Sequence, residues 1–171
     1  DSDYSNIMYS LIHTILLAKK ELLITTPYFI PNSSFKDAIK IASLSGVKIK
    51  LLVPGASDSV IVNTTSHSFY KELLEAGVKI FTYKKGFVHA KTVVCDGFIS
   101  VVGTANLDNR SFDLNFEINA VVYNKNTANK LIEQFNIDIE NAKEINLKDW
   151  KKRPIYIKLI ENVLRLFSSL M

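Results

Sequence analysis

The chain has 171 residues, which is enough for one domain with a substantial buried core. Hydrophobic residues make up 47% and charged residues 22%, a balance typical of folded globular proteins that argues against a disordered chain. The net charge of +4 suits phosphate-bearing partners such as anionic lipid headgroups or nucleic acid, but it is equally compatible with no preference for partners. No apolar stretch reaches the roughly 20 residues that cross a bilayer.

The single cysteine excludes a disulfide within the chain. Cys95 lies in an apolar run, which predicts a small buried residue and fits a reducing compartment. No signal peptide is visible, and the sequence begins at Asp1. We therefore expect a piece of a longer protein.

Helix-like and strand-like segments alternate along the first half. Apolar residues at helical spacing predict a helix over residues 4–19, and ELLITT predicts a strand over 21–26. Prolines at 27 and 31 predict an extended connection, after which Ser33 or Ser34 caps a helix that ends near Ser45. A strand over 47–53, a helix over 58–76 and a strand over 78–83 follow.

The second half begins with a predicted hairpin. Strands over 87–95 and 98–102 flank Asp96-Gly97, a strong turn signal. The remaining predicted elements are a polar loop over 103–113, a strand over 115–123, a helix over 125–143, an interruption at 150–154 and an amphipathic helix over 155–170. This alternation predicts a single α/β layered domain covering residues 1–171.

A cationic group of side chains surrounds the hairpin. His89 and Lys91 are two apart in a predicted strand, so both side chains point to one face. The paired strand brings Thr104 and Asn106 back toward the level of His89, where they offer a hydroxyl and an amide donor. The group therefore predicts a phosphate site.

Histidine can attack phosphorus or protonate a leaving oxygen, and either role requires its second ring nitrogen to be held. Glu117 is the candidate holder, since a carboxylate in an apolar strand needs a partner; an ion pair with Arg110 is the structural alternative. Asp96 opens the turn and could be purely structural. No set of ligands typical of a metal site is visible.

The segment HAKTVVCDGFISVVGTAN matches the pattern H-x-K-x4-D-x6-G-[S/T]-x-N of the phospholipase D superfamily, known as the HKD motif. TTPYFIP, LLEAGVKI and GTANLDNRSFDLNFEINA further resemble the C-terminal half of bacterial cardiolipin synthases. The similarity covers essentially the whole chain. The HKD set fixes six positions in a fitting strand and hairpin context, so a chance match is improbable.

The resemblance implies an α/β/α sandwich around a mixed sheet. It implies transfer of a phosphatidyl group between phosphatidylglycerol molecules through a phosphohistidine, with no metal or other cofactor. His89 would be the general acid and base, Glu117 would hold it, and Lys91, Thr104 and Asn106 would bind the phosphate. Asp96 would count as part of the active motif.

The same resemblance implies a partner and a location. A second HKD half, from the same polypeptide or from a second copy of this chain, would complete the site. The full-length protein would sit at the cell membrane with its catalytic domain in the cytoplasm, and this piece alone would be soluble. The alternatives are a homodimeric single-HKD phosphodiesterase or nuclease, for which nucleic acid is the less favoured substrate, and a non-catalytic lipid-binding module.

His13 is expected at the boundary of an apolar stripe, without a catalytic role. Three other features leave two interpretations each. His67 either lines the substrate mouth or lies on a solvated helix face. Tyr28 and Phe29 either contact lipid or pack in the core. The helix over 155–170 either packs on protein, which is the favoured interpretation, or lies on a membrane surface.

Overall fold

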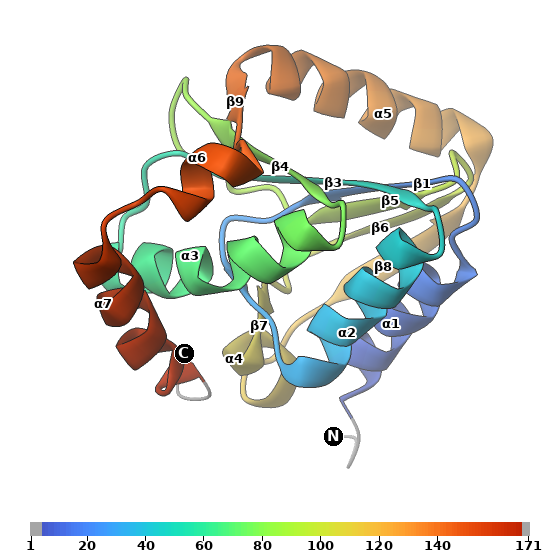
Figure 1. Ribbon diagram of the computed structural model, residues 1–171. Coiled ribbons are helices and arrows are strands. Elements are labelled where there is room, and N and C mark those ends of the chain that lie inside the picture. Colours follow the sequence, from blue (N-terminus) through green and yellow to red (C-terminus); the bar gives the residue numbers. More distant parts are fainter. Residues whose placement is uncertain (1–4, 169–171) are drawn as a thin grey trace.

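The structure is a computed structural model that describes residues 5–168. The predicted helix start at Tyr4 and the tail residue Leu170 lie outside these residues. A mixed β-sheet runs through the centre with helices on both of its faces (Figure 1). The α/β/α sandwich and the single domain that the sequence predicts match this architecture.

The main sheet has the strand order β8-β6-β5-β1-β3-β4-β9 among the described residues. Its strands are β1 (Glu21–Thr25), β3 (Lys48–Pro54), β4 (Lys79–Tyr83), β5 (Thr92–Cys95), β6 (Ile99–Gly103), β8 (Asn119–Tyr123) and β9 (Ala142–Glu144). β1, β3 and β4 pair in parallel, whereas β5, β6, β8 and β9 join antiparallel. A separate two-stranded sheet pairs β2 (Phe29–Ile30) with β7 (Leu107–Asp108).

Seven helices are described. They are α1 (Asn6–Leu17), α2 (Ser33–Leu44), α3 (Val60–Glu75), α4 (Asn109–Asp113), α5 (Lys125–Glu140), α6 (Leu147–Lys151) and α7 (Ile155–Arg165). The cap predicted at Ser33 or Ser34 is wrong. The Asn32 side chain accepts the N–H of Phe35 instead, which leaves both serines inside the first turn of α2.

The two faces of the sheet carry separate apolar cores. Leu22 and Ile24 of β1 join the larger core, which α1, α2 and α3 cover, while Leu23 points the other way. Leu23 packs with Ala128 and Phe135 of α5, which crosses the opposite face (Figure 1). Because both faces are buried, the strand reads as a continuous apolar run rather than an alternating one.

The strand predicted over 87–95 begins only at Thr92. Its neighbour β1 ends at Thr25, opposite Thr92, since the chain turns away at Pro27. Residues 87–91 therefore lack a partner strand on that side. The strand predicted over 115–123 likewise begins at Asn119, opposite the last residue of β6.

Several short elements were not predicted. The loop predicted over 103–113 contains β7 and α4, and the helix predicted to reach 143 ends at Glu140, before β9. The interruption predicted at 150–154 begins too early, because the short helix α6 continues through Lys151. Among residues 5–168 no helix is both long enough and apolar enough to span a bilayer.

Candidate phosphodiester-transfer site

His89 and Lys91 lie just before β5, on the segment that extends past the end of β1. The segment stays attached on its other side, where the Gly103 N–H donates to the Lys91 carbonyl at 3.2 Å. The His89 side chain is exposed and Lys91 is half-buried. An extended segment free of one neighbour thus presents its side chains to solvent at the end of the sheet.

The His89 and Lys91 side chains meet, as their spacing predicts. The Lys91 ammonium lies 3.1 Å from Nε2 and 3.3 Å from Nδ1 of His89, and it donates to the His89 carbonyl at 2.9 Å. Burial lowers the Lys91 pKa, against the attraction of Glu117 and Asp108, which raises it. The imidazole and the ammonium can therefore contact one phosphate together.

The loop after β6 is pressed against the start of β8. A Cβ atom at Gly103 would lie 2.3 Å from the Ile118 carbonyl oxygen, so only glycine allows this approach. Thr104 receives the Ile118 N–H at 3.0 Å and donates a short hydrogen bond to Glu117. Together with the bond from the Thr104 N–H to the Ile118 carbonyl at 3.0 Å, this packing joins the loop to the segment before β8.

Asn106 lies inside this loop with its backbone N–H on the Ser111 hydroxyl at 3.1 Å. Its buried amide oxygen has no hydrogen-bond partner among the described residues. The neighbouring Asp108 carboxylate accepts the Ser111 N–H at 2.8 Å and so caps α4. Burial raises the Asp108 pKa, although hydrogen bonds from Ser111 and Asn106 lower it. The Asn106 amide oxygen is therefore free to accept a hydrogen bond from a hydroxyl or N–H group of a ligand.

A cavity of about 420 Å³ opens beside Asn106. Its lining residues come from β2, α3, α4 and the loops around them: Tyr28, Ile30, Ser59, Val62, Asn106, Asp108, Arg110 and Asn115. The Tyr28 ring packs against Phe87, and Phe87 packs against His89, with ring centres 6.1 Å and 5.6 Å apart. The rings connect the cavity to the histidine.

Phe29 is fully buried, which confirms core packing for this residue, whereas Tyr28 lines the cavity and its contact with lipid stays a prediction. The Tyr28 hydroxyl donates to Asp58 at 2.7 Å. Burial and Asp58 raise the Tyr28 pKa to about 12, so this hydroxyl stays protonated at neutral pH. Tyr28 is far from the hairpin in sequence, so no local pattern predicted that it lines this cavity.

Asp96 lies at the opposite end of β5 from His89. Its carboxylate accepts the backbone N–H groups of Lys19, Lys20 and Glu21 at 2.7–2.8 Å, and its φ of 51° opens the turn into Gly97. Burial opposes ionisation, but these hydrogen bonds outweigh it and lower the Asp96 pKa. Asp96 therefore ties the hairpin to the connection between α1 and β1 and stands apart from the other site residues.

Glu117 precedes β8 and is half-buried, while Phe116 and Ile118 on either side are exposed, so the predicted apolar strand around it is wrong. Its carboxylate accepts from Thr104 and, at 3.2 Å, from Asn115. Neither His89 nor Arg110 donates to it in the described part of the chain. The attraction of Glu117 for the Lys91 ammonium still places it at the edge of the site.

A family model described as "Cardiolipin synthase, PLD-like domain" matches residues 11–139. The match includes the whole hairpin and the loop with Asn106. The chain belongs to the cardiolipin synthase family of phospholipase-D-like domains.

Curated relatives agree with this membership. The chain is 45% identical over 157 residues to a cardiolipin synthase of Alkalihalophilus pseudofirmus, covering 92% of this chain and 31% of the relative. It is 42% identical over all 171 residues to a cardiolipin synthase of Oceanobacillus iheyensis, covering 36% of the relative. The chain thus spans about a third of the length of these cardiolipin synthases.

Solved structures share the fold of this cardiolipin synthase domain at low sequence identity. Nuc from Salmonella typhimurium, a phospholipase D family member, superposes with a TM-score of 0.72 and 16% identity, covering 81% of this chain and 90% of Nuc. Phosphatidylserine synthase from Haemophilus influenzae gives 0.75 and 15%, covering 97% of this chain and 45% of the synthase.

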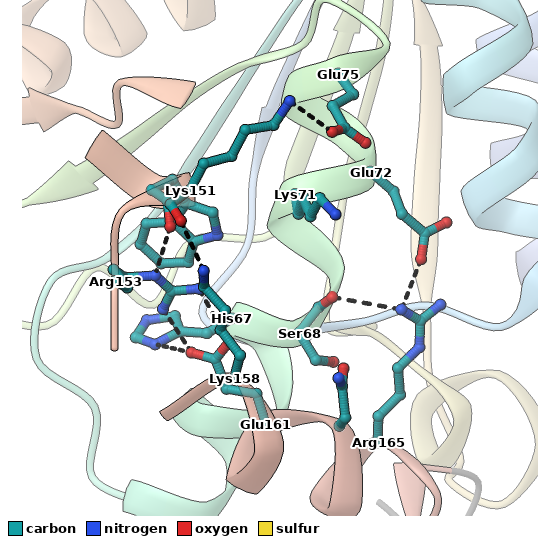
Figure 2. A pocket seen from close by; sticks show the side chains of 12 residues that line it. His67, Ser68, Lys71, Glu72, Glu75, Lys151, Arg153, Lys158, Glu161 and Arg165 are labelled. Carbon is teal, nitrogen blue, oxygen red and sulfur yellow. Dashed lines mark hydrogen bonds and ion pairs between the residues drawn. The ribbon is translucent and has the colours of Figure 1, made fainter. Parts of the chain in front are cut away.

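His67 lies outside this site. It lies on α3 and faces the segment that carries α6 and α7, where it lines a separate cavity of about 560 Å³ (Figure 2). Its ring contacts Tyr70 and Trp150, and Nδ1 lies 3.8 Å from a Glu161 oxygen. Both interpretations of His67 from sequence, a residue at the substrate mouth or on a solvated face, are therefore wrong. His13 is exposed.

Within residues 5–168, no three His, Cys, Asp or Glu side chains cluster closely enough to hold a metal ion. Cys95 is buried as predicted, and burial raises the pKa of its thiol to about 11.

Proposed function

We propose that this chain is the C-terminal catalytic half of a cardiolipin synthase, which transfers a phosphatidyl group from one phosphatidylglycerol to another. The observation that carries the proposal is the contact of the Lys91 ammonium with the His89 ring, on a segment next to the loop after β6 that carries the Asn106 amide. A phosphodiester needs such a set, because cationic and amide donors stabilise the charge that develops on its oxygens. Identities of 40–45% to cardiolipin synthases over 90–100% of the chain support the substrate class.

In the first proposed step, a histidine of a second HKD half attacks phosphorus of phosphatidylglycerol. The bond between phosphorus and the glycerol oxygen breaks, and protonated His89 gives its proton to that oxygen, so glycerol leaves. A phosphatidyl group remains bonded to the attacking histidine. Lys91 and the N–H2 group of Asn106 bind the phosphoryl oxygens throughout, whereas Thr104, whose hydroxyl donates to Glu117, supports the loop.

In the second proposed step, neutral His89 takes the proton from a hydroxyl of another phosphatidylglycerol. That oxygen attacks phosphorus, the bond to the other histidine breaks, and cardiolipin forms. His89 is thereby protonated again, which balances the cycle. We propose that Glu117 acts as a positioning residue that favours the imidazolium, because it already lies beside Lys91 at the edge of the site.

The proposed reaction needs two histidines. The described chain supplies one HKD motif, and we infer that the second belongs to the same polypeptide or to a second copy of this chain. We further propose that the complete protein works at the cell membrane with this domain on the cytoplasmic side, where its lipid substrate is accessible.

A direct test compares this chain alone with this chain joined to the upstream part of a related cardiolipin synthase. Each protein is mixed with phosphatidylglycerol vesicles, and cardiolipin and released glycerol are measured. We expect product from the joined protein and none above background from the chain alone. Rapid product formation by the isolated chain would contradict a second histidine in the same polypeptide and would assign it to a second copy of this chain.

The same two proteins test the alternative functions. Metal-independent cleavage of DNA by the isolated chain, with paired His89 side chains in a two-fold symmetric dimer, would support the nuclease. The structural likeness to Nuc does not favour that alternative, because 16% identity shows the shared fold alone.

A further inference from the structure

The orientation of α7 is the reverse of what an amphipathic helix normally adopts on its own domain. Six large apolar side chains of α7 and the turn after it are 51–79% exposed: Ile155, Leu159, Ile160, Val163, Leu166 and Phe167. We call this set the α7 apolar face. The one buried residue of the helix is a glutamate, Glu161. The apolar face therefore points to the outside of the molecule.

Ion pairs hold α7 in this orientation. Arg153 forms two hydrogen bonds with Glu161, at 2.6 Å and 3.0 Å, and Arg165 pairs with Glu72 of α3 at 2.6 Å (Figure 2). Arg165 also donates to the Ser68 carbonyl on α3. These contacts fix the charged edge of α7 against α3, so the helix cannot turn its apolar face inward without breaking them.

The positive charge of the chain is concentrated in the same segment. Residues 147–168 contain six Lys and Arg side chains and two Asp and Glu side chains. The whole chain has 21 basic and 17 acidic side chains, so the other residues hold 15 of each and are balanced. Lys151 and Arg165 of this segment pair with Glu75 and Glu72 of α3, whereas Lys148 and Lys152, shortly before α7 in the sequence, are exposed. Apolar surface and excess positive charge therefore occur together.

We propose that the α7 apolar face and its flanking lysines form a docking surface for an anionic lipid bilayer. Helices of this kind bury their apolar side chains at the acyl boundary while lysines bind the anionic headgroups. A second copy of the chain fits less well, since it would bring two segments with a formal net charge of +4 together. The helix lies at the edge of the molecule, where a flat surface can reach it (Figure 1).

The surface also adjoins the candidate site. Asn109, at the start of α4, donates to the Ser168 carbonyl just after α7, at 3.1 Å. α4 follows directly on the loop that carries Asn106 and Asp108. Docking would therefore bring the phosphate-binding loop close to the lipid headgroups. The docking proposal does not depend on which reaction the site performs.

The test is co-sedimentation of the 171-residue chain with vesicles of phosphatidylserine and phosphatidylcholine, compared with phosphatidylcholine alone. We expect binding to the anionic vesicles only, weakened by added salt. The double variant Leu159→Glu, Val163→Glu should bind at least about tenfold more weakly, because two charges oppose insertion. Ile41→Glu, Leu44→Glu is the matched control, since both residues are exposed on α2, and it should bind like the original chain.

A charge pair and an active-site variant complete the test. Lys148→Gln, Lys152→Gln should reduce binding several-fold, whereas Lys125→Gln, Lys130→Gln on α5 removes the same charge and should not. His89→Ala should bind normally, which separates docking from the proposed transfer reaction.

Three results overturn the proposal: no binding to anionic vesicles, equal loss in the two glutamate variants, or loss with His89→Ala. A dimer in sedimentation analysis that Leu159→Glu, Val163→Glu dissociates would assign the surface to a second copy instead.

Discussion

The Lys91 ammonium is held at the proposed phosphate site by its neighbours. It contacts both ring nitrogens of His89 and is attracted by Glu117 and Asp108. Burial lowers its pKa, yet the carboxylates oppose that effect. Lys91 is therefore placed to neutralise charge on a phosphodiester bound beside His89.

Replacing Lys91 tests this role. Lys91→Gln in the joined protein should lower cardiolipin formation by about 10²-fold or more, the usual effect of removing one donor from a developing oxyanion. Lys85→Gln is the matched control, because Lys85 is exposed on the preceding turn. Equal rates for the two variants would exclude Lys91 from the phosphate site.

Glu117→Gln tests whether Glu117 positions His89. Glutamine still accepts the Thr104 hydroxyl, so a purely structural role leaves the pH dependence unchanged. If the carboxylate stabilises the imidazolium, its loss should slow transfer about tenfold and move the alkaline limb of the pH–rate profile to lower pH. Glu133→Gln on α5 is the control, and an unshifted profile would assign Glu117 to the loop alone.

The sequence predicted which side chains carry the chemistry, but it did not predict which residues line the neighbouring cavity. His89 and Lys91 meet because residues two apart in extended backbone share a side, even though their segment is not part of the sheet. Tyr28 and Arg110 line the cavity only because β2 pairs with β7. That pairing joins segments almost 80 residues apart in the sequence, so no local pattern predicts it.

At the scale of elements, Asp96 stabilises a connection rather than the phosphate site. Its carboxylate binds three consecutive backbone N–H groups between α1 and β1. An asparagine at this position has only one acceptor oxygen. We therefore expect Asp96→Asn to lower the free energy of unfolding by about 2 kcal/mol, measured by urea denaturation. Asp37→Asn, on the exposed side of α2, should change it little.

The pH dependence of that difference has a definite sign. The Asp96 pKa is lower in the folded chain than in the unfolded one. The stabilisation is therefore present above the unfolded value and is lost as pH falls through the folded value. The gap between the original chain and Asp96→Asn should close in acid. A gap that stays constant would show that the carboxylate charge is not the source.

The long elements were predictable because periodicity marks them, whereas the short ones depend on partners. β9 is three residues long and forms by pairing with β4, and α6 is a five-residue helix that Asn146 caps. Neither carries enough residues for a periodic pattern. Asn32, not Ser33 or Ser34, caps α2, because the Asn32 side chain accepts the Phe35 N–H.

At the scale of the whole molecule, one buried network joins the C-terminal segment to α3. His67 faces Glu161, Arg153, Tyr70 and Trp150. Burial and the charge of Arg153 lower its pKa to about 4. His67 is therefore neutral in the folded chain at neutral pH.

Acid should weaken the fold through His67. Its unfolded pKa is 6.5, so between that value and about 4 the unfolded state binds the extra proton and stability falls as pH falls. At about 1.4 kcal/mol for each pKa unit, the loss approaches about 3 kcal/mol. His67→Gln should lose this component of the pH dependence, whereas His13→Gln should retain it. Parallel curves for the two variants would contradict the low pKa.

The membership in the cardiolipin synthase family and the sandwich fold were predictable from the HKD motif and the segments around it, because the motif requires particular residue types at fixed spacing. The reversed orientation of α7 was not predictable. Its apolar stripe suggests packing on the domain, while the structure buries Glu161 and leaves the stripe exposed.

The most direct test of the central claim measures cardiolipin and glycerol made from phosphatidylglycerol by the joined protein carrying His89→Ala or, as control, His13→Ala. If His89 transfers the proton in both steps, His89→Ala should lose about 10³-fold in rate while keeping its unfolding transition, and His13→Ala should keep full activity. Full transfer activity in a folded His89→Ala protein would contradict the account.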